Sequence, residues 1–416
     1  MLLETSQSVS DTQDAGADVA AACETPRLSV AQATPVEFNP PELPGATGSM
    51  GLASAILRTN GCVRHRILKA SLNIVTFMET NQMKNCPRVS IGLPVFNGER
   101  YLASAIESIL AQSFADFELI ICDTASTDAT RTICMRYANQ DQRVRYYRHE
   151  RNLGAAANFN STVKLATGEY FKWAAHDDLL EREFLEKCIE ALESDSTAVL
   201  CHSLVTMLGE NGAKWRERYD AAGLNVEHFR PSQRFGARLR TLRFVEVFGV
   251  IRTKTLKETD LIGKYPHADR VLLAELALLG RLINVPEFLF TFRDHPARSA
   301  RLKNPQDLLA WYDTSKTRRR VFVTWTRYAA YLRMIRRHVA DPAERFRCWG
   351  MLLLSLCVNG HLLRLALDPV VALDPRVLPA VLSARRRIFG GKTPKLYERI
   401  VEKGTSNHRS TSYEDV

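Results

Sequence analysis

Two kinds of hydrophobic spacing alternate through the middle of the chain. Segments such as 89–95 and 117–122 are predominantly apolar over six or seven consecutive positions. Residues 101–112, between them, carry apolar side chains at intervals of three or four. The first kind predicts strands buried on both faces, and the second predicts an amphipathic helix packed against them.

The alternation continues to about residue 207. Further strands are predicted at 144–147, 170–174 and 198–207, and further helices at 128–138, 158–166 and 180–192. Strands and helices that alternate with short connections predict an α/β fold, a Rossmann-like, mostly parallel sheet with helices on both faces. Ligands bind such sheets outside the carboxyl ends of the strands, so loops 96–100, 123–128 and 175–178 form the candidate site.

The two ends of the chain lack this alternation. Residues 1–50 are polar without a hydrophobic period, and we expect residues 1–82 to be disordered or dispensable, with Met83 as the biological start. The α/β domain is predicted to span 83–300. Residues 301–402 predict a basic helical extension, and 403–416 form a polar tail.

Composition and charge restrict the class of protein. The 416 residues are 45% hydrophobic and 25% charged, which fits a soluble globular protein and excludes collagen-like and fully disordered chains. Nine cysteines without a CxxC pair indicate a reduced, cytoplasmic protein without a zinc cage. The net charge of +10 is concentrated at residues 301–416, which hold 22 Lys and Arg against 10 Asp and Glu.

This basic extension interleaves arginine with aromatic residues, as around Trp325 and Tyr331. It is compatible with a peripheral position on the inner face of the cytoplasmic membrane, and equally with ordinary helices that have solvated arginine faces. Nucleic acid is not expected as a partner, because no nucleic-acid-binding motif accompanies the charge.

Carboxylates follow two of the predicted strands. Asp123 ends a buried strand, where it could accept hydrogen bonds from a ribose or a base, or could cap the next helix as Asp128 could. Asp177 and Asp178 follow a later strand and would suit Mg²⁺ or Mn²⁺ bridging diphosphate oxygens. The alternative is that one of them caps the helix near Leu180.

Four motifs together resemble the family 2 glycosyltransferases, which have the nucleotide-sugar-binding GT-A fold. Residues 89–99 (VSIGLPVFNGE) look like the first strand and nucleotide loop of that family, and 123–128 (DTASTD) like its second-strand Asp-Asp-Gly-Ser-x-Asp motif. Arg151-Asn152-Leu153-Gly154 with Asn158 is similar to the Arg-Asn-x-Gly segment, and 167–170 leads into the metal motif. The resemblance covers about residues 88–300.

The resemblance implies a set of donor-site residues. Those of the nucleotide site are Pro94, Phe96, Glu99, Asp123, Ser126, Asn158, Ala175 and His176; those of a divalent cation are Asp177, Asp178 and His295. The chain departs from the family pattern at Ala175, which replaces the first carboxylate of Asp-x-Asp, and at Thr124 and Ala125, which replace Asp-Gly. Asp178 or His295 could compensate for Ala175, although a lone histidine is as often structural.

The same resemblance places the catalytic base at Asp269, in the first turn of an apolar helix. A base must reach the acceptor hydroxyl, and a helix N-terminus is expected to lower the pKa of this carboxyl. The alternative role is first-turn charge for the helix.

The implied activity is transfer of a sugar, with inversion, from a nucleotide-sugar, expected to be a UDP-sugar, to a hydroxyl of a glycan or lipid-linked acceptor. Cell-envelope or exopolysaccharide synthesis is the setting that the family suggests. Two alternatives stay open: another nucleotide-using α/β enzyme such as a nucleotidyltransferase, and an inactive membrane-associated scaffold. A dinucleotide-dependent dehydrogenase is disfavoured because no GxGxxG follows the first strand.

Overall fold

A computed structural model describes residues 86–217, 230–241, 244–299, 302, 305–316, 322–358, 362, 365, 366, 368 and 369. The predictions for residues 1–82 and for the tail 403–416 lie outside the described residues, as does most of 359–402.

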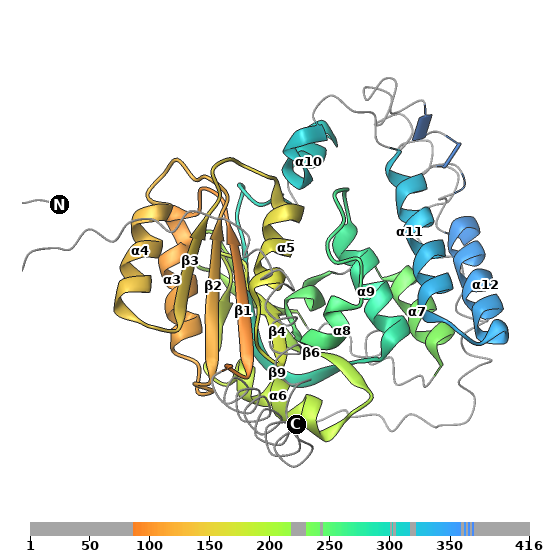
Figure 1. Cartoon of the computed structure of the whole chain (residues 1–416), viewed down its shortest axis with the longest axis horizontal. Coiled ribbons are helices and arrows are strands. Elements are labelled where there is room, and N and C mark those ends of the chain that lie inside the picture. Colours follow the sequence, from red (N-terminus) through yellow and green to blue (C-terminus); the bar gives the residue numbers. More distant parts are fainter. Residues whose placement is uncertain are drawn as a thin grey trace, which may run out of the picture. The chain divides into compact units, whose positions relative to one another are not determined.

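The first half of the sheet is parallel. Its strands are β1 (Val89–Val95), β2 (Phe117–Asp123), β3 (Val144–Arg148) and β4 (Tyr170–Trp173), in the spatial order β3-β2-β1-β4. Every residue of β1, β2 and β4 is buried, as the apolar runs predicted. Figure 1 shows α3 (Glu99–Leu110) and α4 (Thr130–Gln140) on one side of these strands and α5 (Ala155–Leu165) on the other.

The second half of the sheet is mixed. Its elements are β5 (Leu179–Leu180), α6 (Phe184–Ser194), β6 (Ala198–Gly209), β7 (Lys214–Glu217), α7 (Pro231–Arg240), the 3₁₀ helix η2 (Val245–Phe248), β8 (Val250–Arg252), α8 (Thr253–Lys257), α9 (Ala268–Leu279) and β9 (Arg281–Asp294). The sheet continues β4-β8-β6-β9-β5, with β7 beside β6.

Only β6 and β9 pair in parallel in this half; the β4–β8, β6–β8, β5–β9 and β6–β7 pairs are antiparallel. Parallel pairing needs a long crossover, whereas β6 and β7 are joined by a tight turn in which Gly212 has φ +79°. The predicted α/β fold is therefore confirmed, with its uniformly parallel part confined to the first four strands.

The C-terminal part is helical, as expected. It contains α10 (Pro305–Tyr312), the 3₁₀ helix η4 (Thr314–Lys316), α11 (Val323–His338) and α12 (Pro342–Val358). α11 packs on α9, and α12 packs on α7 (Figure 1). These four helices share a second hydrophobic core that includes Phe235, Leu278, Tyr331, Ile335 and Leu352. Among the described residues, no helix has both the length and the apolar character needed to cross a membrane.

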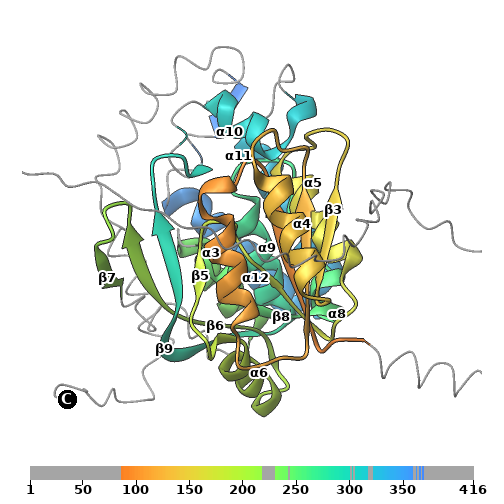
Figure 2. The ribbon, with the colours of Figure 1, turned by 90° about the vertical axis from the view of Figure 1, so that its left-hand side faces the viewer.

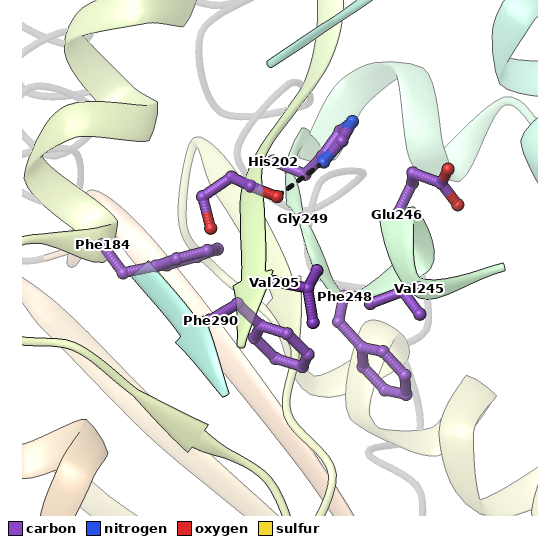
Figure 3. Close-up of a pocket in the computed structure, with 9 residues that line it drawn as sticks. Phe184, His202, Val205, Val245, Glu246, Phe248, Gly249 and Phe290 are labelled. Carbon is purple, nitrogen blue, oxygen red and sulfur yellow. Dashed lines mark hydrogen bonds between the residues drawn. The ribbon is translucent and has the colours of Figure 1, made fainter. Parts of the chain in front are cut away.

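A small internal pocket lies between η2, β6 and β9. Figure 3 shows Phe184, Phe248 and Phe290 lining it, with His202 at its rim bonded to a neighbouring backbone carbonyl. The buried ammonium of Lys172 faces two of these rings, 4.8 Å from the Phe184 centroid and 5.5 Å from that of Phe290. No residue of the predicted site lines this pocket, so it belongs to the core and not to the site.

Candidate functional site

The carboxyl ends of β1, β2 and β4 bring three loops together, and we call residues 96–101, 123–130 and 175–178, with His295, the edge cluster. Its centre is the completely buried carboxylate of Asp123. Asp123 Oδ1 accepts the Ser126 N–H at 2.8 Å, and Oδ2 accepts the Tyr146 hydroxyl at 2.8 Å and Arg148 Nη1 at 2.5 Å. Both oxygens are thus used inside the protein, and Asp123 fixes the loop that follows β2.

Reciprocal hydrogen bonds join the loop after β1 to the loop after β2. The Asn97 N–H donates to Ser126 Oγ (2.9 Å), while Asn97 Oδ1 accepts the Thr127 N–H (2.9 Å). The Glu99 N–H donates to Asp128 Oδ2 (3.0 Å), and Glu99 Oε2 accepts the Ala129 N–H (2.8 Å). Asn97 can close this turn because it adopts a positive φ of 50°, which asparagine tolerates better than most residues. Glu99 and Asp128 therefore each accept a hydrogen bond from a backbone N–H of the other residue's loop.

Thr124 compensates locally for the carboxylate that the family motif would place there. Its Oγ1 accepts the Leu153 N–H at 2.9 Å and donates to the Arg151 carbonyl at 3.3 Å. Ala125 adopts a positive φ of 59°, the conformation that glycine would favour. Asn158, from α5, donates through Nδ2 to the Val95 carbonyl at 3.1 Å, while its buried Oδ1 has no partner among the described residues.

The predicted metal residues come from two segments far apart in sequence. β5 pairs antiparallel with β9, placing Leu179 opposite Thr291, so that residues 177–178 lie beside the end of β9. Figure 2 shows β5 between β9 and α3. Asp177 Oδ2 lies 2.9 Å from His295 Nε2, and both side chains are buried. Asp177 and His295 therefore form a convergent pair of potential ligands.

Asp178 is bonded to residues outside this pair. Its Oδ1 accepts the Arg293 N–H at 2.9 Å and Arg298 Nη1 at 3.2 Å, and its enclosed Oδ2 has no partner. Burial raises the pKa of Asp178 to about 7, against the opposing effect of Arg298. Burial would also raise the pKa of Asp177, but the charges of His176 and Arg298 and the hydrogen bond with His295 hold it below the ordinary value. No group of three or more Asp, Glu, His or Cys side chains is arranged as a metal site in the described part of the chain.

The remaining predicted residues lie around this pair. Pro94 is buried in β1, whereas Phe96 at the loop tip is 43% exposed. His176 approaches the β1 loop so closely that a Cβ on Gly98 would lie 2.8 Å from its ring. Ala175 is half-buried beside it. The Tyr101 ring packs on His295 at 4.9 Å and under the Arg293 guanidinium at 4.6 Å. The edge cluster is thus one contiguous surface.

Asp269 lies in a second cluster, which we call the α9 cluster: Asp269, Arg270, Tyr312 and Arg327. Asp269 lies in the first turn of α9, which begins at Ala268 after the N-cap His267, a residue with a left-handed φ of 65°. Its Oδ1 accepts the Arg270 N–H at 2.9 Å. Burial raises the pKa of Asp269, although the Arg270 N–H and guanidinium oppose the shift. The expectation of a lowered pKa is wrong, because α10 and α11 cover this helix start and desolvation outweighs the helix dipole.

No hydrogen bond or ion pair among the described residues joins Asp269 to the edge cluster. Sequence reasoning missed Arg148, Arg298 and Arg327, which contribute the cations of the two clusters. Arg298 could have been suspected from its position three residues after His295. Arg327 lies in a helix rich in arginine, and nothing in its spacing separates it from exposed neighbours.

Comparison with known proteins matches residues 90–259 to the family model described as Glycosyl transferase family 2. A putative glycosyltransferase, EpsE of Bacillus subtilis, is 41% identical over 112 residues, which are 27% of this chain and 40% of EpsE. Chondroitin synthase of Escherichia coli is 30% identical over 163 residues, 37% of this chain and 24% of that protein. The chain thus spans less than half the length of these relatives.

Among solved structures, S. aureus TarS 1–349 in complex with UDP is similar to this chain, with 17% sequence identity and a TM-score of 0.48. The alignment covers 79% of this chain and 94% of that chain. The matched family region runs from β1 through α8 and contains the β1, β2 and β4 loops of the edge cluster. The mixed sheet with helices on both faces is the GT-A-like architecture that the four motifs imply. Residues 90–259 therefore form a domain that matches the family 2 glycosyltransferases.

Proposed function

We propose that the protein transfers a sugar, with inversion, from a nucleoside-diphosphate sugar to a hydroxyl of a glycan or lipid-linked acceptor in cell-envelope or exopolysaccharide synthesis. The observation that carries this proposal is the Asp177–His295 pair, 2.9 Å apart at the carboxyl edge of the sheet, with cationic Arg293 and Arg298 next to it. A site that combines an oxygen and a nitrogen ligand with two guanidinium groups suits a diphosphate.

The residues present fit a divalent cation. Mg²⁺ and Mn²⁺ are held by one or two carboxylates, with substrate phosphates and water completing the shell, so Asp177 and His295 would suffice as protein ligands. Bound there, the cation would neutralise charge on the leaving nucleoside diphosphate. Arg293 donates through Nε to the Asp177 carbonyl at 2.9 Å and so holds the loop of residues 175–178 in place. Asp178, already bonded to Arg298, acts as an anchor of that loop rather than as a ligand.

The nucleoside occupies the loops after β1 and β2, with Phe96 as the exposed aromatic at its rim. Because both oxygens of Asp123 are used by Tyr146, Arg148 and Ser126, we propose that Asp123 shapes the base and ribose site through these partners. Asp269 accepts the proton of the acceptor hydroxyl. Its raised pKa makes it a stronger base than an exposed aspartate.

The test is calorimetric titration of UDP into the full chain, with and without Mn²⁺, for the wild type, Asp177→Ala and the matched control Asp116→Asn, an exposed carboxylate. We expect Mn²⁺-dependent UDP binding that weakens at least tenfold in Asp177→Ala and is unchanged in the control. GDP and dTDP are titrated in parallel to identify the nucleotide. Failure of all three nucleotides to bind would contradict the proposal and favour the scaffold alternative.

A nucleotidyltransferase would share the nucleotide loops but would have no use for Asp269. Retention of full turnover in Asp269→Asn together with release of diphosphate from a nucleoside triphosphate would favour that alternative.

The outer face of α12 carries the proposed membrane contact. Phe346, Trp349 and Leu353 are spaced three and four residues apart and are 72%, 40% and 61% exposed, while Cys348 and Leu352 on the opposite face are buried. Exposed arginines 336 and 347 lie on α11 and α12. We propose that this face rests on an anionic bilayer at the inner side of the cytoplasmic membrane, where a lipid-linked acceptor would be presented.

Co-sedimentation with phosphatidylglycerol and phosphatidylcholine vesicles tests this contact. Binding to the anionic vesicles alone, lost in Phe346→Ser/Leu353→Ser, is expected. A dimer in light scattering that the same substitutions dissociate would show instead that a second copy covers the face.

A further inference from the structure

The α9 cluster contains two arginines, which come from the packed helices α9 and α11. Arg270 follows Asp269 in the first turn of α9, and Arg327 lies in α11. Arg327 is only 8% exposed, and Arg270 is half-buried. Each guanidinium interacts electrostatically with Asp269, and Arg270 also interacts with Arg327, so the three charges share one small region.

Neither guanidinium makes a hydrogen bond or an ion pair with any described residue, and Nε of each is enclosed without a partner. Other enclosed arginines among the described residues have at least one hydrogen-bonded partner, including Arg238 and Arg281, whose Nε atoms are also unbonded. Arg298 bonds to Asp178, and Arg234 donates to the carbonyls of Ala277 and Leu278. An enclosed cation without a partner is unfavourable unless a ligand supplies the missing anion.

The nearby carboxylates do not supply that anion. Glu275 is bonded to His338 at 2.8 Å, and Asp260 to Arg333 and Arg337. Asp313 accepts the hydroxyl and N–H of Ser315 through Oδ1, and its Oδ2 forms an ion pair with Lys264 at 4.0 Å. Asp269 alone remains, so the cluster holds two positive charges against one negative charge. Burial lowers the pKa of Arg270, as expected for a cation that the protein does not neutralise.

We propose that Arg270 and Arg327 form an anion-binding subsite for the acceptor, holding a phosphate or carboxylate group beside the hydroxyl that Asp269 deprotonates. This inference rests on the proposed function, and it restricts the acceptor to anionic molecules. A guanidinium presents parallel N–H donors that match a phosphate or a carboxylate, and two of them could clamp one oxyanion.

We assign the donor diphosphate to the edge cluster and not to this subsite. In the edge cluster, the groups that act most strongly on Asp177 are His176, Arg298 and His295. These groups would match the negative charge of the diphosphate. The groups acting on Arg270 are instead Asp269, Arg327, Tyr331 and Tyr312. The two clusters thus provide separate cations for two separate anions.

The test measures binding of sn-glycerol 3-phosphate to the full chain by calorimetry, alone and with saturating UDP and Mn²⁺. D-Glycerate and glycerol are titrated in the same way, and the variants are Arg327→Gln, Arg327→Lys and the control Arg136→Gln, an exposed arginine of α4. We expect binding of at least one anionic probe and none of glycerol. Arg327→Gln should weaken it about tenfold or more, with Arg327→Lys intermediate and the control unchanged.

The choice between the probes identifies the source of the anion, a phosphate or a carboxylate. UDP affinity should stay within twofold of wild type in Arg327→Gln, which separates this subsite from the donor site. No binding of either anion, equal binding to Arg327→Gln, or mutually exclusive binding of UDP and the anion would overturn the proposal. Loss of UDP binding in the wild type would instead count against the proposed function.

A second measurement guards against a purely structural role for Arg327. Thermal unfolding of Arg327→Met in chloride should occur at or above the wild-type temperature, since no protein partner is lost. Adding the bound probe should raise the unfolding temperature of the wild type but not of Arg327→Met. A variant that unfolds several degrees below the wild type in chloride would show that Arg327 stabilises the fold, and would overturn the assignment.

Discussion

The edge cluster and the α9 cluster treat their charges in opposite ways. In the edge cluster Asp123 is paired with Arg148 and Asp178 with Arg298, and the loops exchange backbone hydrogen bonds through Asn97 and Glu99. In the α9 cluster burial raises the pKa of Asp269, and the two arginines beside it have no hydrogen-bond or ion-pair partner in the described part of the chain. The carboxylates of Asp123 and Asp178 thus each have an arginine partner, whereas the guanidinium groups of Arg270 and Arg327 have none among the described residues.

This difference has a physical consequence for the two halves of the reaction. Internal partners fix the donor loops before the nucleotide arrives, so little ordering remains to be done on binding. Unpaired charges in the α9 cluster make the folded state less favourable but would give the proposed acceptor strong contacts. Substitutions in the edge cluster should therefore reduce stability, and those in the α9 cluster should reduce turnover.

The largest expected effect is that of Asp269→Asn on turnover. Removing the base should lower the transfer rate 10²- to 10⁴-fold, the range typical of general-base catalysis. UDP affinity should be unchanged, and stability at pH 7 should equal or exceed that of the wild type, because the raised pKa means that burial disfavours the ionised carboxylate. Turnover with the proposed donor and acceptor classes, nucleotide calorimetry and thermal unfolding measure the three quantities.

The pH dependence has a definite sign. The base works when ionised, so wild-type turnover should fall as the pH drops through a pKa above the ordinary aspartate value of about 3.9. Asp307→Asn, an exposed carboxylate of α10, is the control and should behave as the wild type. A turnover in Asp269→Asn within tenfold of wild type would contradict the expected difference between the two clusters.

The next largest expected effect is that of Asp123→Ala on stability. Truncation removes the acceptor of Tyr146, Arg148 and the Ser126 N–H in a fully buried place, and should lower the unfolding free energy by about 3 kcal/mol. Denaturant unfolding measures the loss. Asp128→Ala, partly exposed at the end of the same loop, should cost only about 1 kcal/mol. Equal losses in the two variants would show that Asp123 is not the anchor of the edge cluster.

The sequence predicted the edge cluster better than the α9 cluster, for reasons visible in particular residues. β1 and β2 are buried throughout, so their apolar runs were sufficient to place the strands and the loops that follow them. The Asp177–His295 contact depends on β5, a strand of only two residues whose pairing with β9 leaves no periodic signal. The direction of the Asp269 pKa shift was mispredicted because its desolvation comes from helices about 45 and 60 residues further along the chain.

The smallest predicted effect at neutral pH concerns Lys172, beneath the edge cluster in β4. Its ammonium is fully buried, and its hydrogen-bond acceptors among the described residues are the carbonyls of Trp173 (3.0 Å) and Phe248 (2.8 Å). Burial lowers its pKa to about 7. The unfolded chain holds this proton up to about pH 10.4, so between pH 7 and 10 it binds more protons than the folded protein. Folding is therefore favoured as the pH rises.

Over that range the Lys172 contribution to the unfolding free energy should increase by up to about 1.4 kcal/mol per pH unit, and by little below pH 7. Lys172→Met keeps the aliphatic stem against Phe184 and Phe290 but cannot titrate, so its stability should lack this slope. Urea unfolding of both proteins at pH 7, 8 and 9 gives the difference directly. Parallel pH profiles would mean that the two carbonyls hold the ammonium charged, and that carbonyls alone can satisfy a cation in this core. In the α9 cluster no carbonyl of the described residues is bonded to the guanidinium of Arg270 or Arg327. The difference between these arginines and Lys172 would then be the lack of hydrogen-bond partners and not the degree of burial.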